Sequence, residues 1–211
     1  MIRETFAVGP LQCNCSILAD EENKEAIVVD PGDEVERIAN KIEELGLAVK
    51  AIIHTHAHID HIGATAELAA LTGAPTFLHD EDQFLHQMLE QQAMMIGLSV
   101  PKKGNIDRGL TDEQRITFGK YELGVLHTPG HTPGSVCFSV PGEDLCFSGD
   151  TLFFQGIGRT DLWGGDFGAL ESSIRDRLYS LNSAVEVIPG HGPNTTIDRE
   201  KLTNPFVRLR A

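Results

Sequence analysis

A histidine-rich segment that directly follows an aliphatic run is the strongest constraint on how this chain can fold. Three imidazoles and one carboxylate occur within the six residues His56 to His61, just after Ala51-Ile52-Ile53. Imidazole nitrogens and a carboxylate oxygen are the donors that zinc and similar divalent ions bind. A structural role explains a lone buried histidine, but it does not explain this density. We therefore predict a metal site where a strand ends and the next turn begins.

The same arrangement, a strand-like run followed by a turn with potential ligands, occurs four times. After the first run, the ligand candidates in such turns are His131, Asp150 and His191. Functional side chains commonly lie at strand ends, and repeated delivery there indicates one shared sheet edge. Two prolines and two glycines surround His131, which fixes the path of its loop before any ligand binds.

These segments together supply more donors than one tetrahedral ion needs, and the number suits two ions whose shells are completed by solvent. In an extended lead-in, His56 and His58 lie on the same side, whereas the turn into the next helix redirects Asp60 and His61. One short segment can therefore serve two adjacent metal positions. The seven candidate metal ligands are His56, His58, Asp60, His61, His131, Asp150 and His191.

Periodicity and turn residues predict a chain that mixes strands and helices. The predicted strands are 6–8, 15–18 and 26–29 as an antiparallel meander, then 49–53, 76–79, a hairpin over 115–127, the pair 135–140 and 144–147, and 185–188. The predicted helices are 33–46, 60–71, 80–92 and 166–181. Asp33 with Glu36, and separately Asp166, are expected to cap helix N-termini.

Composition excludes several functional classes. A formal net charge of −14 and a pI near 4.9 oppose binding to nucleic acid or to an anionic membrane. Residues 1–6 lack the apolar core of a secretory signal, and no apolar run approaches the roughly 20 residues that span a bilayer. We expect a cytoplasmic protein with one domain, 1–211, and reduced cysteines; its oligomeric state is not predicted.

Several side chains outside the predicted site have structural interpretations. Cys13 and Cys15 alternate along a strand and point to one face, which favours packing over a redox role. His79 and His86 are predicted to be structural. The methionine-rich segment 94–104 is interpreted as gap-filling core followed by a solvated loop. The alternative is an adaptable apolar and basic wall beside the site.

The ligand-bearing motifs resemble a known family. Thr-His-x-His-x-Asp-His, Pro-Gly-His-Thr-Pro-Gly, Ser-Gly-Asp and Pro-Gly-His-Gly occur here in the order and spacing of the metallo-β-lactamase superfamily, over nearly the whole chain. The resemblance implies an α/β fold, an αββα sandwich of two mixed β-sheets with helices outside. It also implies one metal on His56, His58 and His131, a second on Asp60, His61 and His191, and Asp150 as the bridge. We predict Asp60 and Asp150 to be the catalytic residues.

Within the superfamily the chain is similar to the glyoxalase II group, which hydrolyses hydroxyacyl-glutathione thioesters. Gly158-Arg159-Thr160-Asp161 and Thr203-Asn204-Pro205-Phe206 look like segments of its short bacterial members. The implied chemistry is attack on a small-molecule thioester, such as S-lactoylglutathione, by a hydroxide bridging two divalent metals. Zinc is the first choice, with iron or manganese as alternatives. Family lactamases commonly place a cysteine at the second metal, which argues against β-lactam cleavage here.

Two other functions stay open at this point. Persulfide dioxygenases of the superfamily share the Gly-Arg-Thr-Asp loop and hold one iron by two histidines and one aspartate, here His56, His131 and Asp150. A noncatalytic binding protein stapled by metals is the more remote alternative, because structural zinc sites are usually closed by four ligands. The metal's identity and the acyl group of the substrate are not predicted.

The substrate-binding residues are also open. Full-length glyoxalase II adds a helical domain that helps hold glutathione, whereas this sequence stops at Ala211, so the thiol carrier can differ. Lys102, Lys103 and Arg159 are candidate contacts for the carboxylates of a carrier, and Arg159 can equally form an internal salt bridge. Asp30, at its own strand end, is expected either to orient a ligand imidazole or to cap a helix.

Overall fold

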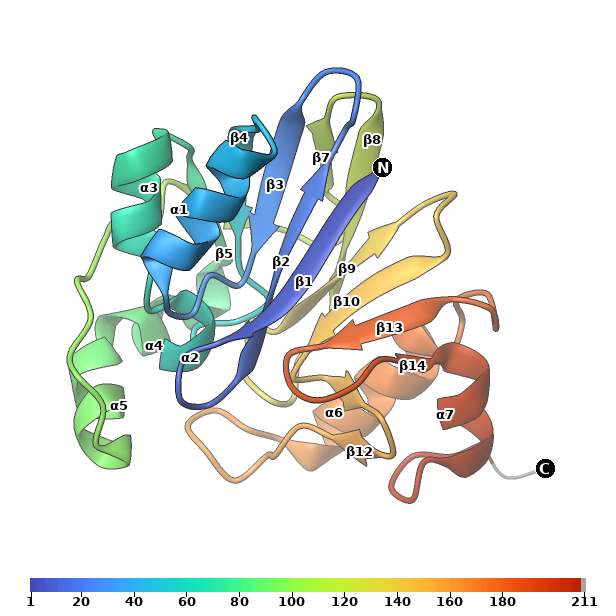
Figure 1. Cartoon of the computed structure of the whole chain (residues 1–211). Coiled ribbons are helices and arrows are strands. Elements are labelled where there is room, and N and C mark those ends of the chain that lie inside the picture. The colour runs from blue at the N-terminus through green and yellow to red at the C-terminus, as the bar shows by residue number, and fades with distance from the viewer. Residues whose placement is uncertain (210–211) are drawn as a thin grey trace. The chain divides into compact units, whose positions relative to one another are not determined.

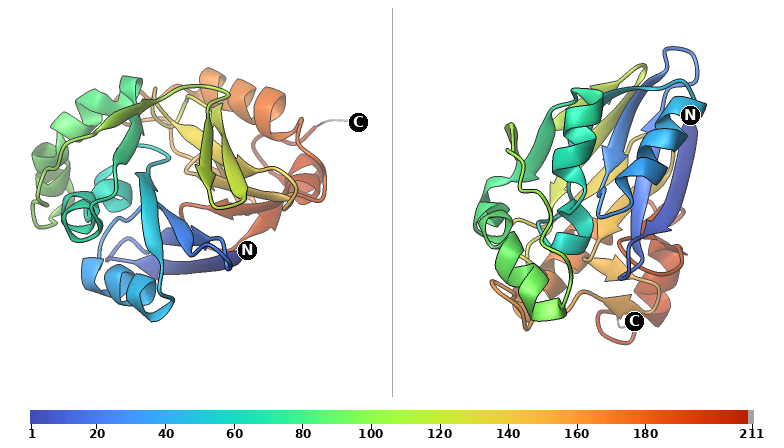
Figure 2. Two further views of the ribbon diagram at one scale, coloured as in Figure 1. Left: turned by 90° about the horizontal axis from the view of Figure 1, so that it is seen from above. Right: turned by 60° about the vertical axis from the view of Figure 1, so that its left-hand side comes forward.

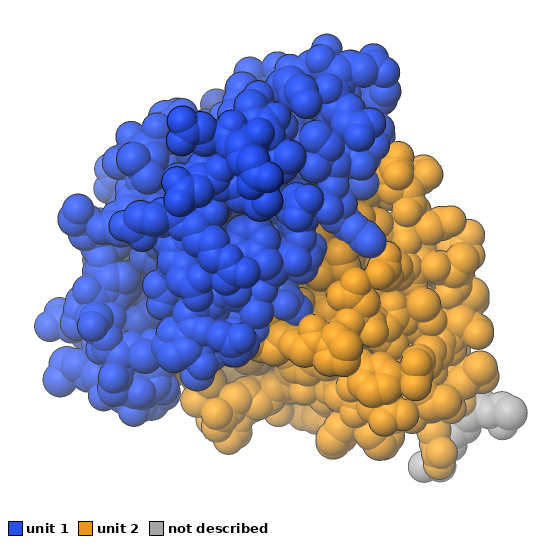
Figure 3. Space-filling model, viewed as in Figure 1, with its two compact units in different colours: residues 1–110, 117–121 blue, residues 111–116, 122–211 orange. Residues whose placement is uncertain are grey.

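The computed structural model describes residues 1–209 (Figures 1 and 2), and its internal contacts divide the chain into two compact units. The first unit consists of residues 1–110 and 117–121, and the second consists of the remaining described residues (Figure 3). Two mixed six-stranded sheets with flanking helices form the structure, as predicted. The single domain over 1–211 stays a prediction.

The sheet of the first unit has the strand order β1-β2-β3-β4-β5-β6. Its first three strands are antiparallel, which confirms the predicted meander, whereas β3, β4, β5 and β6 run parallel. Parallel strands end at a common edge, so the turns that follow β3, β4 and β5 emerge together. The strands are β1(Ile2–Val8), β2(Cys13–Ala19), β3(Glu25–Val29), β4(Ala48–Ile53), β5(Thr76–His79) and β6(Arg108–Leu110).

Two helices, α1(Val35–Glu44) and α3(Thr65–Thr72), contact each other and lie along one face of this sheet (Figure 1). Their apolar residues share a core with the alternate residues of β2, beginning with Cys13 and Cys15, as predicted for packing cysteines. Burial raises the pKa of the Cys13 thiol to about 12, which keeps it protonated. The other helical segments of this unit are α2(Ile59–Ile62), η1(Asp80–Asp82), α4(Gln83–Gln87) and α5(Leu89–Ile96).

The structure corrects four predictions in this unit. The helix predicted over 60–71 is divided into α2 and α3, because the Ala64 amide donates to the Pro31 carbonyl at 3.0 Å and not to the preceding helical turn. The cap predicted at Asp33 is wrong, because α1 begins after Glu34, which has a left-handed backbone with φ 53° and makes no side-chain cap. The helix predicted over 80–92 is broken at Asp82 and again at Met88. The core role predicted for the methionines is also wrong: Met94 is 72% exposed, because α5 buries only the opposite face, through Leu89, Gln92 and Ala93.

The second sheet has the strand order β14-β13-β10-β9-β8-β7. β10 is parallel to β13 and antiparallel to β9, which is antiparallel to β8, so β8, β10 and β13 all run in one direction. Their carboxyl ends therefore lie at one edge. The single edge predicted for all four ligand-bearing strands holds for these three, whereas β4 belongs to the other sheet. The strands are β7(Arg115–Phe118), β8(Tyr121–His127), β9(Val136–Val140), β10(Leu145–Gly149), β13(Glu186–Pro189) and β14(Thr195–Thr196).

The helices of the second unit pack on β9, β10 and β13 through one apolar cluster. Asp166 caps α6(Phe167–Ser172) by accepting a hydrogen bond from the Ala169 amide at 2.8 Å, as predicted. The helix continues as the π-helical segment η2(Ser173–Leu178). The short pair β11(Leu152–Phe153) and β12(Gly156–Ile157), β14, and α7(Ile197–Thr203) were not predicted. Within residues 1–209, no helix has the length and apolar character that crossing a membrane requires.

Candidate metal centre

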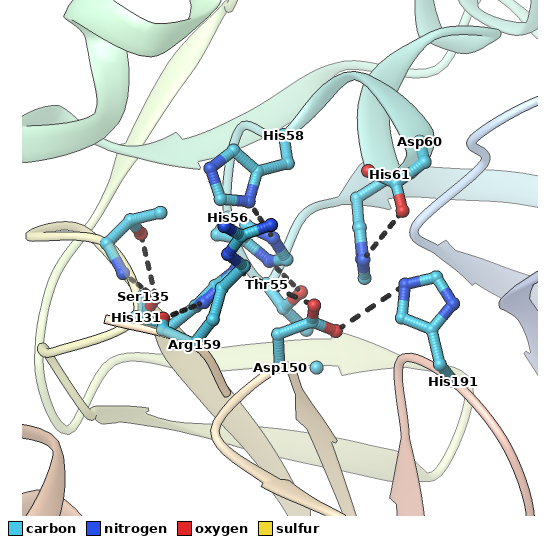
Figure 4. Close-up of polar contacts among 12 residues, drawn as sticks. Thr55, His56, His58, Asp60, His61, His131, Ser135, Asp150, Arg159 and His191 are labelled. Carbon is cyan, nitrogen blue, oxygen red and sulfur yellow. Dashed lines mark hydrogen bonds and ion pairs between the residues drawn. The ribbon is translucent and has the colours of Figure 1, made fainter. Parts of the chain in front are cut away.

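Four of the predicted ligands form a cluster immediately after β4, in which the three histidines are buried and Asp60 is partly exposed (Figure 4). His56 Nε2 lies 3.1 Å from His58 Nδ1, and the ring centroids of His56 and His61 are 4.1 Å apart. His61 Nε2 lies 3.7 Å from Asp60 Oδ2. The backbone of His58 is extended and α2 starts at the next residue, as predicted for the change of direction. The cluster therefore consists of one histidine pair and one histidine–aspartate pair.

Asp30 orients two of these imidazoles from the end of the adjacent strand β3. Its Oδ2 accepts a hydrogen bond from His61 Nδ1 at 3.0 Å and another from Thr55 Oγ1 at 2.7 Å. The Thr55 hydroxyl oxygen lies 3.1 Å from His56 Nδ1. Since this hydroxyl gives its hydrogen to Asp30, it accepts from His56 Nδ1, so the lone pair that can bind a metal lies on Nε2 in both rings. Of the two roles expected for Asp30, the structure shows orientation.

Two residues hold the backbone between the ligands, and sequence reasoning missed both. Gln92 on α5 accepts from the Ile59 amide at 3.0 Å and donates to the Ala57 carbonyl at 3.1 Å. Asp82 accepts from the Ala57 amide at 2.9 Å. Both side chains are buried. Because residues 57 and 59 alternate with the candidate ligands, these bonds fix the direction of the ligand side chains.

His54, two residues before the cluster, shows what a structural histidine looks like in this fold. Its Nδ1 donates to the Phe77 carbonyl and its Nε2 faces the Thr65 hydroxyl, both at 2.7 Å. It is completely buried, and burial lowers its pKa to about 4. Both ring nitrogens thus form hydrogen bonds with groups outside the candidate ligand set, whereas Nε2 of His56 and Nε2 of His61 each face another candidate ligand.

The second unit brings the other three predicted ligands together around one carboxylate. Asp150 Oδ2 lies 3.6 Å from His131 Nε2, and Asp150 Oδ1 lies 3.8 Å from His191 Nε2. Each oxygen of one carboxylate therefore faces a different imidazole (Figure 4). These residues follow β8, β10 and β13, the three strands that share a direction.

The loop after β12 orients His131 through its backbone rather than its side chains. The Arg159 carbonyl accepts a hydrogen bond from His131 Nδ1 at 2.8 Å, which leaves Nε2 as the donor atom facing Asp150. The guanidinium of Arg159 forms two bonds with Asp161, at 2.7 and 2.8 Å, and both side chains are more than half exposed. The structure thus shows an ion pair for Arg159, and its contact with a substrate stays a hypothesis.

A glycine lies against the backbone of each ligand segment. A Cβ on Gly32 would lie 1.5 Å from the carbonyl oxygen of Asp60, and a Cβ on Gly158 would lie 1.8 Å from that of Asp150. Such distances are far below van der Waals contact, so any side chain there would displace the ligand-bearing backbone. Sequence reasoning missed Gly32, although the Asp-Pro-Gly turn after β3 was a signal for it.

The other basic candidates and the remaining histidines take different places. Lys102 Nζ lies 3.5 Å from Glu67, and Lys103 donates to the Gln87 side chain. His79 accepts from the Glu81 amide. His86 is buried, and burial lowers its pKa. The structure assigns His79 a capping role and His86 a place in the core, in agreement with the structural role predicted for both.

The chemistry of the two donor sets fits divalent cations. The donor atoms are imidazole nitrogens and carboxylate oxygens. Hydrogen bonds fix the tautomers of His56, His61 and His131, and every one of the histidines except His191 is buried. Nitrogen and oxygen donors of this kind suit zinc, iron and manganese. They place negative charge in buried surroundings, where a cation compensates it. The site therefore supports divalent metals without fixing their identity.

Comparison with known proteins supports the fold and the family. The sequence profile of the Metallo-beta-lactamase superfamily matches residues 8–191. Hydroxyacylglutathione hydrolase GloC of Haemophilus influenzae is 40% identical over 215 residues, which cover 99% of each chain. The crystal structure of the B3 metallo-β-lactamase BLEG-1 matches with a TM-score of 0.91 and 38% identity over 98% of this chain and 99% of that one. TTHA1623, in a di-iron-bound form, matches with a TM-score of 0.88 and 41% identity over 98% and 100%. The predicted fold class is confirmed.

Proposed function

The chain belongs to the metallo-β-lactamase superfamily, and from this premise we propose that it is a binuclear metal-dependent thioester hydrolase. S-lactoylglutathione, or a related hydroxyacyl thioester, is the proposed substrate. Similarity over 99% of both chains to a hydroxyacylglutathione hydrolase supports this substrate class. The coarser assignment, a metal-binding hydrolase, rests on the family itself and on the clustered histidines and aspartates.

The position of Asp150 is the observation that carries the binuclear proposal. One carboxylate whose two oxygens face two different imidazoles is suited to bridge two cations. The first unit offers a matching division, because His56 pairs with His58 and Asp60 with His61. We assign the seven donors to two ions: His56, His58 and His131 to one, Asp60, His61 and His191 to the other, and Asp150 to both.

The protein's own residues prepare this chemistry. Divalent ions, when bound, supply Lewis acidity toward the thioester carbonyl and activate water at neutral pH. Asp30 keeps the Nε2 lone pairs of His56 and His61 available, and the Arg159 carbonyl does the same for His131. Gln92 and Asp82 hold the backbone so that the ligands need little rearrangement. The thiol leaving group, with a pKa near 8.5, departs as thiolate without a general acid.

A second candidate reaction is β-lactam hydrolysis. The specific observation in its favour is the TM-score of 0.91 with the B3 metallo-β-lactamase BLEG-1, at 38% identity. The second-metal site, which is acidic here where family lactamases commonly place a cysteine, is the reason to rank it second. Thioester and β-lactam substrates need the same attack on an activated carbonyl, so one site can be assayed for both.

The test combines metal analysis with substrate assays on the purified protein. We expect about two transition-metal ions per chain and hydrolysis of S-lactoylglutathione. Removal of the metals by a chelator should abolish turnover, and adding zinc, iron or manganese back separately should show which ion restores it. Released thiol is measured directly, and a chromogenic cephalosporin serves in the parallel β-lactam assay.

Each alternative gives a distinct result in these assays. One equivalent of iron with oxygen uptake on glutathione persulfide would replace the hydrolase proposal by the dioxygenase. Turnover of the cephalosporin without thioester cleavage would favour the second candidate reaction. A metal-loaded protein that is inert toward all three substrates would indicate metals with a structural role.

A further inference from the structure

A cavity of about 550 Å³ in the first unit has no role in the chemistry described so far. It is bounded by the turn between β1 and β2, the start of α1, the helices α2 and α3, and the segment 98–102. Its volume lies within the range of small-molecule sites. Asp60, one of the candidate ligands, is part of its wall. The cavity therefore adjoins the metal-ligand segment within one unit.

The charge of the lining is predominantly negative. Within the described part of the chain, one lysine and no arginine line the cavity, against five carboxylates: Asp33, Glu34, Glu36, Asp60 and Glu67. Arg37 pairs with Glu34 at 2.9 Å, and a bound metal would compensate Asp60. Lys102 lies 3.5 Å from Glu67, with both side chains substantially exposed, so this pair is weak. Asp33 and Glu36 therefore carry the excess negative charge of the cavity lining.

Apolar side chains form the rest of the wall. Leu11 and Val100 line the cavity, yet they are 45% and 55% exposed, so they offer apolar surface that an occupant can cover. Ile59, the residue before the ligand Asp60, also lines the cavity. The lining thus combines an acidic part, one ammonium and apolar patches, which complements a zwitterionic organic molecule rather than a polyanion.

We propose that this cavity binds the thiol-carrier part of the thioester substrate and selects a carrier that bears an ammonium group over a phosphorylated carrier. The proposal rests on the proposed thioesterase function and deepens it. The ammonium of the carrier lies against the acidic part formed by Asp33, Glu36 and Glu67, and Lys102 receives a carboxylate. A polyphosphate carrier would meet net repulsion in the same place.

The test compares carriers that differ in charge, using the metal-loaded full chain. Its substrates are S-lactoylglutathione, the same thioester with an acetylated α-amine, and lactoyl-coenzyme A. Acetylation removes the ammonium and should raise KM about five- to tenfold with little change in kcat, because the contact is distant from the carbonyl. The coenzyme A thioester should show a still higher KM.

Variants identify the carboxylates that cause the difference. Glu36→Gln combined with Glu67→Gln should reduce the effect of acetylation to about twofold, as expected when two nearby charges are removed. Glu43→Gln combined with Glu90→Gln is the matched control, since both glutamates are exposed and lie outside the cavity lining. An effect of acetylation that is the same in both double variants would overturn the proposal.

Direct binding separates this proposal from the proposed reaction. S-hexylglutathione is a thioether that no hydrolase cleaves, so calorimetry with it is informative even if the protein hydrolyses no thioester. We expect binding that weakens about five- to tenfold on acetylation of the ligand amine. Absent binding, or equal binding of both forms, would overturn the cavity assignment and leave the thioesterase proposal to its own assays.

Discussion

In the first unit, four candidate ligands follow a single strand within six residues, whereas in the second unit three candidate ligands follow three different strands. The first cluster is supported by side chains from neighbouring elements: Asp30 after β3, Asp82 in η1 and Gln92 on α5. The second cluster is supported mainly by backbone, through the Arg159 carbonyl and the close approach of Gly158 to Asp150. The candidate ligands of the first unit are thus brought together by their closeness in sequence, and those of the second unit by the alignment of three strands in one sheet.

This difference predicts how each cluster fails. A change in the first cluster should affect mainly one metal position, because His56 faces His58 and Asp60 faces His61. A change at the centre of the second cluster should affect both positions, because one carboxylate faces both imidazoles. Counting the metal ions retained by each variant is the measurement that distinguishes these outcomes.

The largest effect is expected for Asp150→Asn. This substitution removes the charge that faces His131 and His191, so we expect kcat to fall on the order of 10²–10³-fold, with loss of both ions. Asp60→Asn should retain one ion and lose less activity. Metal content and S-lactoylglutathione turnover are measured on the same preparations, with circular dichroism to verify folding. Asp198→Asn, an exposed aspartate of the same unit, is the control. Equal metal loss in the variants of Asp150 and Asp60 would contradict the shared role of Asp150.

A second comparison uses the glycine of each unit. Gly158→Ala should displace the Asp150 backbone and Gly32→Ala that of Asp60, and each should destabilise the fold by about 1–3 kcal/mol through overpacking. Gly158→Ala is expected to weaken the binding of both ions, and Gly32→Ala mainly the binding of the ion assigned to Asp60 and His61. Denaturant unfolding gives stability, and titration with a chromogenic chelator gives the affinity of each ion. Gly156→Ala is the control, since its added Cβ meets atoms no closer than 3.5 Å. If both variants lost affinity for the same ions to the same extent, the two ligand clusters would not be held in different ways.

The side-chain support of the first unit predicts a smaller effect for Gln92→Leu. The substitution removes the bonds to the backbone of Ala57 and Ile59, so the ligand turn should loosen and metal affinity fall about 10-fold. The neighbouring Gln91→Leu is the control, because Gln91 is exposed. The spectrum of the cobalt-substituted protein reports ligand geometry independently of turnover. An unchanged spectrum and affinity in Gln92→Leu would show that the Gln92 side chain has no role in positioning the ligands.

Features that depend on residues close together in the sequence could be predicted from it. The strands could be predicted from apolar runs that end in turns, and the helix after Asp166 from its cap and its spacing of leucines. The ligands His56 to His61 were evident because they are adjacent. His131, Asp150 and His191 were recognised because each follows a strand-like run, and the family resemblance added their roles.

The residues that were missed act over long separations and are of ordinary type. Gln92 bonds to Ala57 across 35 positions and Asp82 across 25, and neither residue carries a local signal. The helix break at Met88 lies inside a segment with good helical periodicity. Across this break, the Gln92 side chain donates a hydrogen bond to the Leu85 carbonyl. Tertiary hydrogen bonds determine these features, so single-sequence periodicity does not contain them.

The smallest expected effect concerns an ion pair that tethers the segment 111–116 in the second unit. Arg177 forms two bonds with Asp112, at 2.7 and 2.9 Å, and this contact lowers the pKa of Asp112. Since the folded pKa lies below the unfolded one, the stabilisation is fully present above the unfolded pKa of about 3.9 and is lost as the pH falls through the folded pKa. Asp112 is 40% exposed, so Asp112→Asn should cost at most about 1 kcal/mol at neutral pH.

Urea unfolding of Asp112→Asn and the unsubstituted protein at pH 7, 5 and 3 measures this difference, which should diminish at the lowest pH. Glu34→Gln is the counterpart in the first unit, because Arg37 likewise lowers the pKa of Glu34 and the pair is more exposed. Neither variant should change the number of bound ions, since both pairs lie outside the ligand clusters. Asp112 also accepts a hydrogen bond from the His127 amide at the end of β8. Loss of an ion in Asp112→Asn alone would therefore mean that the second cluster depends on how the end of this strand is held, which would strengthen the contrast between the units.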